Sequence, residues 1–170
     1  QKERGLTAGY VGSNGTKMLS QLKQQRQVAD VALADYHKSL ANYPADYKNA
    51  DFISKTSKIA NSLNLLTQRR QQITSLEISL GEALGYYTAQ NAIMLNLFEL
   101  IIKAGDSLGI ANRAAAYVYF LQSKERSGIE RAVISGVFAQ DMFTGNLKFR
   151  FITLMSEQNT FLKKIGRAHV

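Results

Sequence analysis

The stretch that decides the fold is residues 108–139, LGIANRAAAYVYFLQSKERSGIERAVISGVFA. Its apolar and small residues recur every three or four positions, which is the period of an amphipathic α-helix. At about 100° per residue they form one stripe, made by Ile110, Ala114, Tyr117, Val118, Leu121, Gly128, Ile129 and Ala132. The pattern therefore predicts one long helix over residues 108–139 with a buried face.

The rest of the chain shows the same period. We expect further helices at residues 3–40, 51–79 and 82–103, and a last one beginning near residue 147. Glycines weaken the start of the first helix, and Pro44 ends it because proline disfavours helical geometry in the residue before it. Asp51 is a possible cap for the second helix. Long amphipathic helices with short connections predict an all-α, antiparallel up-and-down bundle.

Composition excludes several kinds of site. The chain has 170 residues, 45% of them hydrophobic, which is enough for the core of one domain. It has no cysteine, so disulfides, thiolate metal sites and thiol nucleophiles are excluded. Its two histidines, His37 and His169, stand in no metal-ligand or acid-base cluster, so we expect neither an enzyme nor a metal or other cofactor. The longest uncharged run, residues 83–98, is too short and too polar to span a bilayer.

The net charge of +8 permits nucleic-acid binding, but its distribution does not favour it. The 21 lysines and arginines are scattered, with doublets only at residues 69–70 and 163–164. We therefore expect no nucleic-acid partner through this domain.

The triplet Lys-Glu-Arg occurs twice, at residues 2–4 and 124–126, each time before glycine and small apolar residues. On the helix wheel of residues 108–139, Glu125 lies about 30° from the centre of the stripe, Arg131 about 90° and Arg126 about 130°. In the first helix, Glu3 and Arg4 both lie within about 60° of the centre of its stripe. We thus expect Glu125, Glu3 and Arg4 inside, Arg131 at the margin and Arg126 mostly outside.

Two interpretations of these charges stay open on chemistry alone. In one, Glu3 and Glu125 form ion pairs with arginines and so act as clips between the first helix, residues 3–40, and the fourth helix, residues 108–139. Such pairs are expected because an unpaired buried guanidinium is costly. In the other, arginines from both triplet regions hold one small planar anion between helices, where Gly5 and Gly128 leave room. A structural bundle without a ligand is the alternative to a sensor.

Several segments in order resemble one known family. They are QKERGLTAGYVGSNG, QLKQQR, the RR of the second helix, YYTAQNAIM, KERSGIERAVISGVFAQDMF and RFITLMSEQNTFL, and together they reach from Gln1 to about Leu162. These motifs resemble the nitrate- and nitrite-sensing (NIT) domain. The resemblance implies an all-helical sensor that binds nitrate or nitrite and controls an attached output: a chemotaxis region, a histidine kinase, a cyclic-dinucleotide enzyme or an RNA-binding antiterminator.

The resemblance also implies which residues bind the anion. The family's arginines associated with nitrate correspond here to Arg4 and Arg131, and we take Glu3, Glu125, Gly5, Gly128 and Arg126 as supporting residues. We expect a homodimer with an attached signalling domain, forming the periplasmic part of an inner-membrane receptor, with a cytoplasmic location as the alternative.

The chain begins without methionine and reads as a piece of a longer protein. Residues 165–170, IGRAHV, look like a translated sequencing adapter, so we expect a non-native tail there. Residues 1–164 are then the sensor domain, with the C-terminal part of the family's domain missing.

Overall fold

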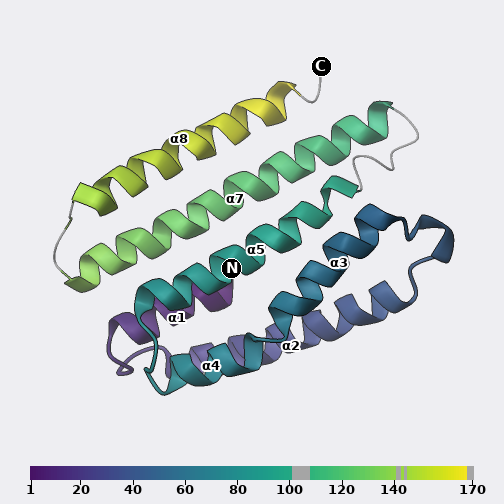
Figure 1. Ribbon diagram of the computed structural model, residues 1–170. Coiled ribbons are helices and arrows are strands. Elements are labelled where there is room, and N and C mark those ends of the chain that lie inside the picture. The colour runs from purple at the N-terminus through teal and green to yellow at the C-terminus, as the bar shows by residue number, and fades with distance from the viewer. Residues whose placement is uncertain (101–107, 141–142, 144, 168–170) are drawn as a thin grey trace. The chain divides into compact units, whose positions relative to one another are not determined.

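The structure, a computed structural model, describes residues 1–100, 108–140, 143 and 145–167. Every regular element in this part of the chain is a helix, which confirms the all-α class (Figure 1). The chain divides into two compact units, Lys2–Tyr87 and Gln1 with Thr88–Val170. Each unit is described by itself.

The first unit begins with two helices where the sequence predicted one. Helix α1 spans Lys2–Gly12 and helix α2 spans Leu19–Ala41. Between them Asn14, Gly15 and Met18 have φ values of 51°, 78° and 68°, in the left-handed region. The amide of Gly15 donates to the carbonyl of Tyr10 at 2.9 Å, which closes the end of α1. The early glycines therefore end the helix instead of only weakening it.

The predicted second helix is also two helices. After the 3-10 turn η1, Ala45–Tyr47, the chain forms α3 over Ala50–Leu63 and α4 over Leu66–Thr74. The N-cap of α3 is Asn49, whose side chain accepts the amide of Phe52 at 2.9 Å, so the expected cap at Asp51 is wrong. Asp51 lies inside the first turn and pairs with Lys55 at 3.9 Å.

Helix α5, Leu80–Leu97, begins with a reciprocal cap. The amide and hydroxyl of Ser79 donate to Glu82 Oε2 at 2.8 and 2.7 Å, and the amide of Glu82 donates to Ser79 Oγ at 3.2 Å. This arrangement satisfies donors at the start of the helix that would otherwise lack partners. The end of the helix predicted at residues 82–103 lies partly outside the described residues.

The core of the first unit joins four of its helices. Its buried members come from α1, α2, α4 and α5: Tyr10, Leu22, Ile73, Ala83 and Tyr87. The Tyr10 hydroxyl donates to the carbonyl of Thr74 at 2.7 Å, so α1 is also hydrogen-bonded to the end of α4. This packing fixes the helix that carries Glu3 and Arg4.

The second unit contains a hairpin of two long helices. Helix α7, Leu108–Gln140, lies beside α8, Gly145–Arg167, and the two run antiparallel (Figure 1). The helix predicted at residues 108–139 is thus confirmed. Its predicted stripe is only partly buried: Val118 and Ala132 are buried, whereas Ile110 and Tyr117 are exposed. Across the described residues, none of the helices has the length and apolar character that crossing a bilayer requires.

Candidate functional site

The clearest polar site in the first unit is built on the carboxylate of Glu3, in the first turn of α1. Arg70 of α4 donates to it with both arms of its guanidinium, from Nε to Oε1 at 2.7 Å and from Nη2 to Oε2 at 2.8 Å. The hydroxyl of Tyr87 on α5 donates to Oε1 at 2.8 Å. The Glu3 side chain is only 8% exposed, so these contacts replace its hydration.

Arg26 of α2 completes this group, and we refer to Glu3, Arg26, Arg70 and Tyr87 as the Glu3 cluster. Its Nε lies 3.4 Å from Glu3 Oε1. Its Nη1 donates to the hydroxyl oxygen of Thr74 at 2.8 Å and its Nη2 donates to the carbonyl of Arg70 at 3.1 Å. The cluster therefore connects α1 with α2, α4 and α5.

Electrostatics in the cluster favour the ionised arginine and the neutral tyrosine. Burial lowers the pKa of Arg70, but hydrogen bonds and charge attraction from Glu3 and Asp30 outweigh it and leave that pKa above its ordinary value. Burial, and secondly the negative charge of Glu3, raise the pKa of Tyr87 well above its ordinary value. Tyr87 thus keeps its proton at neutral pH, and its hydroxyl donates a hydrogen bond to the carboxylate of Glu3.

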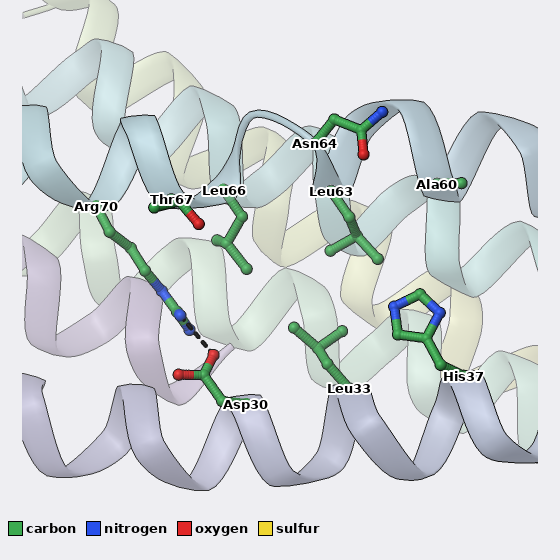
Figure 2. Close-up of a pocket in the computed structure, with 9 residues that line it drawn as sticks. All are labelled: Asp30, Leu33, His37, Ala60, Leu63, Asn64, Leu66, Thr67 and Arg70. Atoms are coloured by element: carbon green, nitrogen blue, oxygen red, sulfur yellow. Dashed lines mark hydrogen bonds and ion pairs between the residues drawn. The ribbon is translucent and has the colours of Figure 1, made fainter.

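A cavity of about 390 Å³ adjoins the cluster on the side of Arg70. Figure 2 shows it between α2 on one side and α3 and α4 on the other. Arg70 and Asp30 meet at one end, with Nη1 and Oδ1 at 2.5 Å, and His37 lies at the other end. The remaining lining residues are Leu33, Ala60, Leu63, Asn64, Leu66 and Thr67. Arg70 therefore connects the buried carboxylate of Glu3 with an open, partly apolar hollow.

Two other residues of the predicted site belong to the first unit. Arg4 is among the most buried side chains described, with 1% exposure. Gly5 is exposed, and a methyl group added there would contact no atom of the described residues. The wheel thus placed Glu3 and Arg4 correctly inside the fold.

The other predicted site residues belong to the second unit. Glu125 is buried and accepts the side-chain amides of Gln1 at 2.7 Å and Asn91 at 3.2 and 3.3 Å. Gly128 is half-buried. Arg131 is exposed on α7, so the expectation that it lies at the margin of the buried stripe is wrong.

Arg126 is more enclosed than the wheel predicted. Its Nε donates to Glu157 Oε2 at 3.0 Å and its Nη1 donates to Gln122 Oε1 at 2.7 Å. Its guanidinium carbon lies 5.0 Å from the centre of the Phe161 ring. Because α8 packs on this side of α7, Arg126 is half-buried instead of mostly outside.

The structure thus brings Glu3 together with residues that the sequence argument did not select as its partners. The interpretation as clips paired Glu3 with an arginine of the fourth helix, whereas in the structure it contacts Arg26, Arg70 and Tyr87. The available signal was in the motifs QLKQQR, RR and YYTAQNAIM, which contain these three residues. Arg4 belongs to the first unit and Arg131 to the second.

Known proteins similar in sequence identify the family of this chain. The sequence profile of a family described as nitrate and nitrite sensing matches residues 1–168. The chain belongs to the nitrate- and nitrite-sensing (NIT) family. This membership confirms the resemblance seen in the sequence motifs, and it defines the chain as a sensing module of that family.

Two relatives of this NIT chain are similar over nearly its whole length. The nitrate regulatory protein of Klebsiella oxytoca is 25% identical over 159 residues, which are 93% of this chain and 40% of the relative. The solved structure of the NasR transcription antiterminator matches with a TM-score of 0.91 and 23% identity, over 98% of this chain and 45% of that chain. The NIT chain therefore spans less than half the length of both relatives.

These relatives show that two sequence expectations are wrong. We expected no nucleic-acid partner through this domain, yet the same fold occurs in a transcription antiterminator, and transcription operates on nucleic acid. We expected a periplasmic domain of an inner-membrane receptor, yet both relatives are named as regulators, one of them of transcription, which takes place inside the cell. The distribution of charge along this chain carries no information on the segments that these longer relatives have beyond it.

Proposed function

We propose that this chain binds nitrate or nitrite through Arg4 and Arg131 and relays the bound state to an output that regulates transcription. The observation that carries the proposal is the family match over residues 1–168. The two relatives favour a transcriptional output over a chemotaxis receptor or a histidine kinase. The role is sensing and regulation, with no catalytic step.

The chemistry of arginine supports this choice of residues. A planar guanidinium offers donors in a fork that matches a planar oxyanion, which the ammonium of lysine does not. Arg4 is buried in α1, where a low effective dielectric strengthens its attraction for an anion. Arg131 is exposed on α7, so solvent anions reach its guanidinium. Arg126 is held by Glu157 and Gln122, which argues for Arg131 as the arginine of the second motif that meets the anion.

An anion that binds one conformation selectively shifts the population of that conformation. At ten times its dissociation constant, such a ligand stabilises the bound state by about 1.4 kcal/mol. This free energy is enough to bias a regulatory equilibrium without unfolding either unit. We expect a dissociation constant in the micromolar range or weaker, about 8 kcal/mol or less in binding free energy.

The test is calorimetric titration and thermal denaturation of the protein with nitrate, nitrite and, at equal ionic strength, chloride. Nitrate or nitrite should raise the melting temperature more than chloride does. Arg4→Lys and Arg131→Lys should each weaken binding by about 1–3 kcal/mol, because the charge stays but the fork is lost. Arg126→Ala should leave binding nearly unchanged. A binding defect confined to Arg126→Ala would contradict the assignment of Arg131.

The alternative is a structural, dimerising bundle without a ligand. One observation favours it: the carboxylate of Glu3 is contacted within its own unit by Arg70, Arg26 and Tyr87. On this interpretation nitrate has no effect beyond that of chloride, and the Lys substitutions change only the melting temperature. The titration above separates the two.

A further inference from the structure

Helix α1 is attached to the rest of its unit by polar contacts at two places. Near its start, Glu3 accepts both arms of Arg70, and near its end Tyr10 donates to the carbonyl of Thr74 at 2.7 Å. Arg70 and Thr74 are separated by one turn of α4, and the Thr74 hydroxyl donates to the carbonyl of Arg70 at 2.8 Å. The register of α1 along α4 is therefore set at both ends.

The Glu3 cluster also fixes the rotation of α1. The paired donors of Arg70 form a planar fork that accepts one orientation of the carboxylate. The Tyr87 hydroxyl approaches the same carboxylate from α5, and Arg26 approaches it from α2. Contacts from three helices leave a carboxylate that is 8% exposed little freedom to turn. A small rotation of α1 would break several charged hydrogen bonds at once.

Arg4 follows Glu3 directly, so the two side chains leave the same turn of α1 about 100° apart. We propose that the Glu3 cluster positions Arg4 for its anion, with Arg70 and Tyr87 as positioning residues that set nitrate affinity without touching nitrate. The inference rests on the proposed function, because it assumes that Arg4 binds the anion. Holding the backbone of Arg4 in advance lowers the entropy lost on binding, which is the physical basis of the effect.

The chain provides a matched control for each positioning residue. Arg69 neighbours Arg70 on α4 and donates to Gln72 of its own helix at 3.1 Å. Tyr86 neighbours Tyr87 on α5 and donates to the carbonyl of Ser62 at 3.2 Å. Each control loses the same chemical feature as its partner variant, but away from the carboxylate of Glu3.

The experiment measures nitrate dissociation constants by calorimetry for Arg70→Lys, Arg69→Lys, Tyr87→Phe and Tyr86→Phe in the intact protein. Circular dichroism first establishes a temperature at which every variant is folded. Arg70→Lys should bind nitrate about 3- to 10-fold more weakly, and Tyr87→Phe about 2- to 5-fold more weakly. Both controls should bind like the unaltered protein. Tyr87→Phe removes only a hydroxyl from the core, so its fold survives even if Arg70→Lys does not.

A purely structural role for the cluster gives a different pattern. Arg70→Lys and Tyr87→Phe would then lower the melting temperature but leave the nitrate dissociation constant of the folded protein unchanged. That result, with nitrate still bound by the unaltered protein and lost in Arg4→Lys, would overturn this inference and leave the proposed function standing. An unaltered protein that does not respond to nitrate or nitrite would overturn both.

Discussion

The buried charge of Glu3 should make a large contribution to the stability of the first unit. In Glu3→Gln the shape is kept and the charge is lost, so Arg70 and Arg26 lose their shared counter-charge. Removing one partner of a buried ion pair costs about 3–5 kcal/mol. Three features reduce this cost: both arginine side chains are 13–14% exposed, Asp30 still pairs with Arg70, and glutamine keeps an oxygen that accepts from Tyr87. We therefore expect a loss of roughly 2–3 kcal/mol.

For a chain of 170 residues, this loss corresponds to a fall in melting temperature of about 4–12 °C. Thermal denaturation followed by circular dichroism measures it. The control is Glu77→Gln, an equivalent change at an exposed position, which should stay within about 0.5 kcal/mol of the unaltered protein. If Glu3→Gln melts as its control does, the Glu3 cluster does not stabilise the fold, and the reasoning from its burial and charge is refuted.

Three further substitutions test the local structure. Gly15→Ala should cost about 1–2 kcal/mol in urea denaturation, because φ is +78° and the new Cβ would lie 3.2 Å from the Leu76 side chain. Ile73→Ala should cost about 2–4 kcal/mol in the same assay, because Ile73 is fully buried in the core. Glu82→Gln tests pH dependence: hydrogen bonds from Ser79 lower the pKa of Glu82 in the folded state. Its stabilising effect should therefore be present above the unfolded-state pKa of about 4.3 and disappear as pH falls through the lower folded-state pKa. Equal melting temperatures of Glu82→Gln and the unaltered protein at neutral pH would contradict this.

Helices with a strong local pattern were predictable, and their breaks were not. The period of apolar residues gave the bounds of α7 nearly to the residue, and Pro44 correctly marked the end of α2. The break between α1 and α2 places Asn14 and Met18 in the left-handed region, which costs a non-glycine residue roughly 1–2 kcal/mol. Contacts of α1 with α2 and α4 offset this cost. The period of apolar residues within one helix does not predict such tertiary contacts.

The burial of the site residues could be predicted from the sequence, but the residues that they contact could not. The wheel placed Glu3, Arg4 and Glu125 inside the fold, because the angle of a residue from an apolar stripe is a local property. The partners of Glu3 lie 67 and 84 positions away along the chain, at Arg70 and Tyr87. Tyr87 is buried in the core, and its hydroxyl also donates a hydrogen bond to the carboxylate of Glu3. A helix wheel contains no information on which helix packs against which face.

Arg126 shows how unknown packing between helices affects the choice of anion-binding residues. The wheel assigned Arg126 to the outer face of the fourth helix, but that face is covered by α8, with Glu157 and Phe161 around the guanidinium. To bind an anion, Arg126 would have to exchange its contact with a carboxylate for a contact with nitrate, which gains little net charge stabilisation. Arg131 is exposed, and none of the contacts described for it is with a carboxylate, so an anion that approaches α7 there has no such contact to displace. The wheel preferred Arg131 because it placed Arg131 nearer the buried stripe than Arg126, but in the structure Arg131 is exposed and Arg126 is half-buried. The choice of Arg131 therefore rests on the family motif and on the contacts that already hold Arg126, and it stays a prediction.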